Sequence, residues 1–173
     1  MDQTTRQLGW LVLFCLAVSP GCQKPTERSS TEDQKTVRDT VVAFQAALKA
    51  RDADKLWSLL DSDSQADADR AAKTIRDSYS KASAEKKADQ EKAFGLTGAE
   101  LSELTGKGFL KTRRFHGKYD EVPDATIDKV MVDGNNATVA YTEADGDKEN
   151  LYLVRQDGKW KLSLKDMPKA TQS

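Results

Sequence analysis

The amino-acid sequence predicts an α+β fold in which N-terminal helices pack on a C-terminal four-stranded antiparallel meander. Up to about residue 116, apolar side chains recur every three or four positions, which is the period of an amphipathic helix. After Pro123 the period falls to two, as in a strand with one buried face. Asp-Gly steps at 133–134, 145–146 and 157–158 separate the alternating runs. Helices and strands segregated along a chain in this way form α+β domains.

The first predicted helix buries one face. Its apolar residues are spaced by four, three and four positions and therefore share one side: Val37, Val41, Phe44 and Leu48. Asp52 can act as the N-cap of a second, short helix over 53–60, because its side chain can accept from a free backbone N–H. The polar run 61–64 is expected to end this second helix, whose buried residues are Leu56, Leu59 and Leu60.

A third helix is expected to begin near Asp67, since the next small and apolar residues again step by four and three: Ala68, Ala72, Ile75, Tyr79 and Ala82. The highly charged segment 83–93 either continues this helix or forms a new one capped by Ser83. Gly95 is a predicted helix stop. Thr97 and Glu100 have the spacing of a capping box, in which each side chain accepts from the other's backbone N–H. One or two last helical turns are expected over 109–116.

The strands are predicted where apolar and polar residues alternate between turns. Glycine suits such turns because they need positive φ, which glycine adopts without a steric penalty. The predicted strands cover residues 127–132, 137–142, 151–155 and 160–164. Consecutive hairpins give a meander, and the domain as a whole is expected to span 33–166, followed by a polar tail over 167–173.

The N-terminus predicts export. Arg6 precedes an uncharged apolar run over 8–18, which is about half of the roughly 20 residues that a membrane-spanning helix needs. The run ends at Val18-Ser19-Pro20-Gly21-Cys22, which resembles the lipobox of bacterial lipoproteins. The resemblance implies a signal peptide over 1–21, cleavage between Gly21 and Cys22, and fatty acyl chains on Cys22. The alternative is an ordinary signal peptide that leaves Cys22 as a free thiol.

Loss of residues 1–21 would leave Cys22 as the only cysteine, so no internal disulfide is expected and packing alone must stabilise the domain. The 27 basic and 28 acidic residues nearly cancel, which gives no basic field to attract nucleic acid.

The anchor predicts lasting residence in the cell envelope, with the domain facing the periplasm or the exterior. A single lipid chain holds a protein only marginally, whereas mature bacterial lipoproteins carry two or three. In the lipoproteins of some double-membrane bacteria, which this N-terminus resembles, an aspartate after the cysteine marks retention in the inner membrane. Gln23 stands there in this chain, so the resemblance implies the outer membrane. Residues 22–32 lack an apolar anchor and are expected to form the lipidated cysteine and a flexible spacer.

Segments 47–60 and 157–162 resemble the nuclear-transport-factor-2-like superfamily, also called the cystatin-like or ketosteroid-isomerase-like cone. The first segment holds a helix end, an acidic cap and a second helix, and the second ends a long strand pair near a tryptophan. The resemblance implies a concave sheet closed by helices, with a pocket at its wide end. Members include isomerases, dehydratases, cyclases and small-ligand binders, so the fold alone does not decide the function. No acid of this chain matches the catalytic positions of the isomerase members.

Six residues are candidates for a ligand site: Trp57, Tyr79, Phe109, Arg113, His116 and Trp160. His116 is an acid or base near neutral pH if it lines a pocket mouth, and otherwise an exposed loop residue. The aromatic residues either line a pocket or belong to the core. Arg113 belongs to a local basic cluster that either holds an anion or is a solvated helix end. The cluster contains Lys107, Lys111, Arg113, Arg114 and Lys118.

The sequence therefore favours a membrane-tethered, non-catalytic binding or interaction module, whose partner is an envelope protein or a small ligand. One histidine without a spare cysteine argues against a zinc site, and no cofactor or nucleic-acid motif is present. The alternative is a small isomerase- or dehydratase-like enzyme, or a carrier, with His116 or Arg113 facing into the cone pocket.

Mass spectrometry of the protein isolated from cells tests the anchor. We expect the N-terminal peptide to begin at Cys22 and to carry fatty acyl chains. An unlipidated N-terminal peptide, or one that retains residues 1–21, would contradict the lipoprotein assignment.

Overall fold

The computed structural model describes residues 27–164, with side chains over 31–164, and has the predicted α+β architecture. The helical part comprises α1 (Glu27–Ala50), α2 (Ala53–Leu59), α3 (Ser62–Lys81), α4 (Ala84–Phe94), α5 (Gly98–Ser102), α6 (Gly106–Phe109), α7 (Arg113–Lys118) and the 3₁₀ turn η1 (Val122–Asp124). The strands are β1 (Thr126–Asp133), β2 (Asn136–Thr142), β3 (Lys148–Gln156) and β4 (Lys159–Leu162). The predicted signal peptide over 1–21, the predicted cleavage and lipidation positions Gly21 and Cys22, and the predicted tail over 167–173 lie outside the described residues.

The four strands form an antiparallel meander in the order β1-β2-β3-β4, as predicted. Each hairpin turn contains a glycine with positive φ, namely Gly134, Gly146 and Gly158. The strand period places Val139, Tyr141, Leu151 and Leu153 on one buried face of the sheet. The other face bears the exposed side chains of Met131 and Tyr152.

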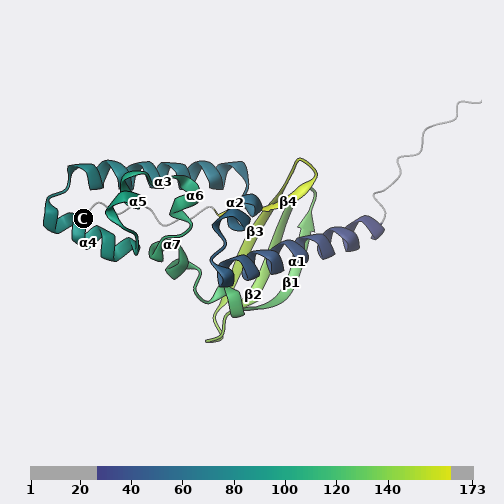
Figure 1. Ribbon diagram of the computed structural model, residues 1–173. Helices are drawn as coiled ribbons and strands as arrows, with labels where there is room; N and C mark the ends of the chain where they lie inside the picture. Colours follow the sequence, from purple (N-terminus) through teal and green to yellow (C-terminus); the bar gives the residue numbers. More distant parts are fainter. Residues whose placement is uncertain (1–26, 165–173) are drawn as a thin grey trace, which may run out of the picture.

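Helix α1 crosses the buried face of the sheet, and helices α3 to α7 lie together beyond the C-terminal end of α1 (Figure 1). The apolar face predicted for α1 is fully buried, and Phe44 is 0 % exposed. Val42, on the outer side of the same helix, is 51 % exposed. An ion pair between Asp33 and Arg155 joins the first half of α1 to β3, and the Arg155 guanidinium lies 4.7 Å from the centre of the Trp160 ring.

The prediction of a flexible spacer up to residue 32 is wrong for 27–32, because α1 begins at Glu27. Residues 27–50 contain no glycine or proline. Once packing fixes the later turns, each further residue adds a hydrogen bond without a new nucleation cost. Helix α1 therefore extends beyond its packed face.

The third helix begins at Ser62 rather than near Asp67. The run 61–64 does end α2, but it also starts α3, because Asp61 is an N-cap whose side chain accepts from the Ser64 N–H at 2.8 Å. Tertiary contact fixes this cap, since the Asp61 N–H donates to the Leu162 carbonyl of β4 at 2.9 Å. Segment 83–93 forms the separate helix α4, capped by Ser83, and 109–116 is divided between α6 and α7.

Other local signals are confirmed. Asp52 caps α2, Gly95 ends α4 with φ of 68°, and Thr97 and Glu100 form the capping box of α5. These interactions are short-range, which is why the sequence pattern alone identified them.

Helix α6 approaches α3 closely through Gly106. A Cβ atom at this position would lie 2.8 Å from the Asp69 backbone nitrogen and closer still to its carboxylate. The Gly106 N–H donates to that carboxylate at 3.0 Å. Glycine is therefore required by the contact between the two helices.

We expect Gly106→Ala to destabilise the domain by about 1–3 kcal/mol, because α6 must move away from α3. Gly117→Ala in α7 is the matched control, since a Cβ there meets nothing within 4 Å. It should be neutral or stabilising by up to about 1 kcal/mol. Urea unfolding of both variants measures the difference, and equal stabilities would contradict the close approach.

Candidate functional site

The four aromatic candidates belong to the core or pack against it. Phe109, Trp160 and Tyr79 are buried in the core, and Trp57 is half-buried against it. The Tyr79 hydroxyl donates to Glu91 at 2.6 Å. These side chains stabilise the fold, and none of them lines either hollow described below.

Arg113 and His116, in contrast, line one surface hollow of about 370 Å³ where α1 ends against α7. We call it the α1–α7 hollow. This volume is near the lower end of the range found for small-molecule sites in proteins, which starts at about 300 Å³. Its remaining wall comes from the end of α1 and from the chain that follows α7: Leu48, Lys49, Arg51, Gly117, Tyr119, Asp120, Pro123 and Asp124.

The end of α1 places Arg51 at the hollow. Arg51 adopts a left-handed conformation with φ of 52°, and its N–H donates to the Leu48 carbonyl at 3.1 Å. The following Asp52 caps α2, so the chain must turn at Arg51. Within the described residues, the Arg51 guanidinium has no hydrogen-bond or ion-pair partner.

Helix α7 is oriented by its own cap. Thr112 is fully buried, donates to the Phe109 carbonyl at 2.7 Å and accepts from the Phe115 N–H at 3.1 Å. Phe115 then points into the core. Arg113 and His116 are three residues apart and therefore share the side of the helix that faces the hollow.

Contacts with α1 hold the segment 119–124, which forms the remaining side of the hollow. The Gln45 side chain donates to the carbonyls of Val122 and Ala125, both at 2.9 Å. Phe44 packs edge-on against Tyr119, with the ring centres 6.0 Å apart. These contacts fix residues 119–124 beside the end of α1.

The hollow carries an excess of positive charge. Lys49 and Asp124 neutralise each other in an ion pair of 3.0 Å. Arg51, Arg113 and the exposed Asp120 remain. Arg113 makes one long hydrogen bond, of 3.4 Å, to the Lys92 carbonyl.

His116 lies on α7 and is half-buried, so it is not the exposed loop residue that the sequence offered as one interpretation. Burial lowers its pKa, the Arg51 charge lowers it further, and a hydrogen bond to the Leu110 backbone opposes both effects. The Nε2 atom is buried and without a partner among the described residues. A neutral ring with a shielded nitrogen suits packing against Phe115 better than proton transfer to a bound molecule.

The predicted basic cluster is dispersed. Lys107 pairs with Asp54 at 2.7 Å, and the Lys118 ammonium lies 5.7 Å from the centre of the Tyr119 ring. Only Arg113 of the five faces the α1–α7 hollow. Anion binding by the whole cluster is therefore not supported by this arrangement.

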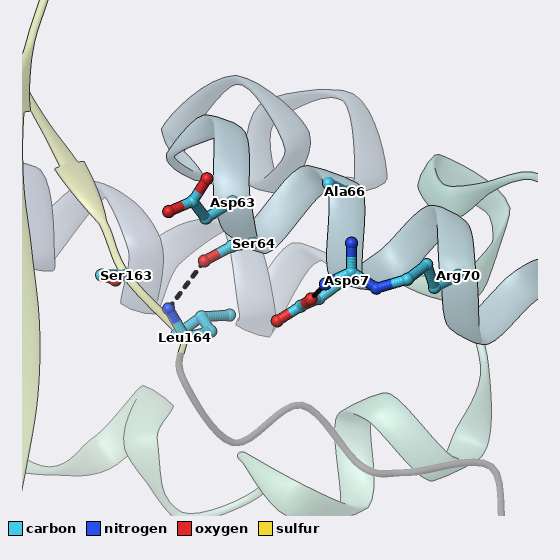
Figure 2. Close-up of a pocket in the computed structure, with 7 residues that line it drawn as sticks. All are labelled: Asp63, Ser64, Ala66, Asp67, Arg70, Ser163 and Leu164. Carbon is cyan, nitrogen blue, oxygen red and sulfur yellow. Dashed lines mark hydrogen bonds and ion pairs between the residues drawn. The ribbon is translucent and has the colours of Figure 1, made fainter.

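A second hollow, of about 330 Å³, lies at the start of α3 (Figure 2). Three of its polar side chains have partners: Ser64 accepts from the Leu164 N–H at 2.8 Å, and Arg70 pairs with Asp67. Leu164, the last described residue, forms part of the wall.

An acidic trio links the loop after α7 to the β2–β3 turn. Carboxylate oxygens of Glu121, Glu143 and Asp145 lie within 4.8 Å of one another. Asp145, burial and Glu143 raise the pKa of Glu121, because like charges oppose ionisation. The trio was not predicted, since the fold alone brings Glu121 close to the other two acids.

Comparisons of the chain with protein-family models, curated proteins and solved structures found no match. None of the helices within residues 27–164 is long and apolar enough to cross a membrane.

Arg51 is the residue that the sequence did not identify as a candidate. Ala50-Arg51-Asp52 is the junction between an amphipathic helix and an N-cap, and such a junction forces the chain to turn. That signal places Arg51 at a helix end, but α7 faces it only through tertiary folding.

His116 should make the stability of the domain depend on pH. Its pKa is lower in the folded state than the value of about 6.5 expected when unfolded, so the unfolded chain binds more protons between these two values. The stabilisation is therefore complete above about pH 6.5 and is lost as the pH falls. His116 is the only histidine of the chain, so this transition can be assigned to it.

We expect His116→Gln to flatten the pH dependence of the free energy of unfolding between about pH 5.5 and 7. Urea unfolding at several pH values measures it, and NMR titration of the imidazole gives the pKa directly. A folded-state pKa above 6.5 would show that the assigned environment is wrong.

Proposed function

We propose that this chain is a lipid-anchored, non-catalytic binding module of the cell envelope, whose ligand or partner binds at the α1–α7 hollow. One observation carries the proposal: two arginines from distant parts of the chain line the same partly apolar hollow, and neither forms an ion pair with another residue of the described part of the chain. Such a combination of apolar wall and a few polar groups is typical of ligand sites.

The envelope location is supported by the short apolar leader and by the lipobox-like end at Cys22. Only four residues, 23–26, lie between Cys22 and Glu27, the first residue of α1. The five residue-to-residue steps from Cys22 to Glu27 can span at most about 18 Å when fully extended. The start of α1 is therefore held near the lipid surface.

Helix α1 then acts as a rigid spacer. Its 24 residues correspond to a rod of roughly 36 Å at 1.5 Å per residue. The hollow lies at the C-terminal end of this rod, opposite the anchored end. The proposed site is thus displaced from the membrane attachment by the length of the helix.

A catalytic role is less well supported. After burial, the next largest effect on the pKa of His116 comes from the positive charge of Arg51 and not from a carboxylate. The Nε2 atom of His116 is also shielded from solvent. General acid–base catalysis needs the reacting proton within hydrogen-bond reach of the catalytic nitrogen. Without that access, the isomerase-like alternative lacks its central residue, whereas a carrier role is compatible with the hollow.

Photo-crosslinking in cells tests the proposal. A photoreactive residue at Gly117, which lines the hollow and is exposed, should give a discrete adduct, whose identity comes from the mass of the purified protein after irradiation. The same residue at Val42, exposed on the middle of α1, is the matched control and should give none. No adduct at Gly117, or the same adduct at both positions, would count against binding at the hollow.

A further inference from the structure

We infer that the α1–α7 hollow binds a carboxylate monoanion attached to an apolar body; this inference rests on the proposed function of the same site. The carboxylate lies between Arg51 and Arg113, and the apolar body contacts Leu48, Tyr119 and Pro123. All five residues line the hollow.

The charge of the hollow selects a monoanion. The Lys49–Asp124 pair contributes no net charge, and Arg51 and Arg113 exceed Asp120 by one positive charge. His116 adds none at neutral pH, because its pKa is lowered. One carboxylate balances this excess, whereas a phosphate dianion leaves an uncompensated negative charge beside Asp120.

Both arginines have donors to spare. A guanidinium has five N–H donors, and its planar arrangement matches the two oxygens of a carboxylate. Arg51 uses none of these donors within the described residues, and Arg113 uses one in the long bond to Lys92. A carboxylate is therefore offered several charge-assisted hydrogen bonds without the loss of an existing ion pair.

The apolar side of the hollow suits the rest of the ligand. Leu48 and Tyr119 are buried, and Pro123 is half-buried. Their positions are fixed, because Gln45 holds the neighbouring η1 turn and Phe44 supports Tyr119. A volume of about 370 Å³ limits the bound part to a small organic acid or to the end of a peptide.

NMR titration of the mature chain carrying Cys22→Ser tests the inference with four probes. Benzoate represents a free organic acid, and N-acetylphenylalanine represents a protein C-terminus. Phenyl phosphate is the dianion at pH 7.5, and benzyl alcohol is the uncharged control. We expect both carboxylates to shift the amide signals of Arg51, His116 and Gly117, and the tighter of the two identifies the source of the carboxylate. Benzyl alcohol should bind at least about tenfold more weakly.

Two variants remove the charges separately. Arg51→Asn retains a residue that tolerates positive φ, and Arg113→Gln removes the second guanidinium. Each should weaken benzoate binding at least about tenfold. Lys159→Gln, which removes an exposed positive charge at the β3–β4 turn, is the matched control and should leave binding unchanged.

The outcomes separate the two claims. If benzyl alcohol or phenyl phosphate binds as tightly as benzoate, or if Arg51→Asn keeps its affinity, the inference is overturned and the binding module still stands. If no probe shifts any signal of the hollow while Gly117 gives its adduct in cells, only the inference fails. If both experiments are negative, both claims fail.

Discussion

The packing of α1 on the buried face of the meander is the interaction on which the rest of the structure depends. Residues 27–164 contain no cysteine, so burial of apolar surface rather than a disulfide must stabilise this part of the chain. Phe44 and its neighbours on α1 share one core cluster with Val139, Leu151 and Leu153 of the sheet. This contact fixes the direction of α1, and both ends of the helix have a role that follows from that direction.

At the N-terminal end, the Asp33–Arg155 pair joins the helix to β3 close to the β3–β4 turn, and Asp33 follows the proposed anchor Cys22 by 11 positions. At the C-terminal end, Arg51 turns the chain toward α2, and Gln45 holds the η1 turn beside it. The helical part must then return along α7 to reach β1. The α1–α7 hollow forms where the end of α1, helix α7 and the segment 119–124 meet, so its shape is a consequence of how α1 lies on the sheet.

The sequence predicted what short-range chemistry determines. The register of α1, the Asp52 cap, the capping box at Thr97 and the glycine turns each depend on a few adjacent residues. The predictions from the sequence were wrong where a tertiary contact determines the structure. Asp61 caps α3 because β4 holds its backbone, and α1 begins earlier than predicted because its later turns are packed. In the candidate site, Arg113 and His116 were predicted but Arg51 was not, because its proximity to α7 involves residues more than 60 positions apart.

Native-state hydrogen exchange tests the central role of the α1–sheet contact most directly. If α1 is held by the sheet, backbone amides of 41–48 in α1 and of β2 and β3 should exchange only through the same global unfolding, with equal and maximal protection. Exchange of the α1 amides by a separate opening of lower free energy, while β2 and β3 remain protected, would contradict the account. In that case the helix end could not fix the position of Arg51.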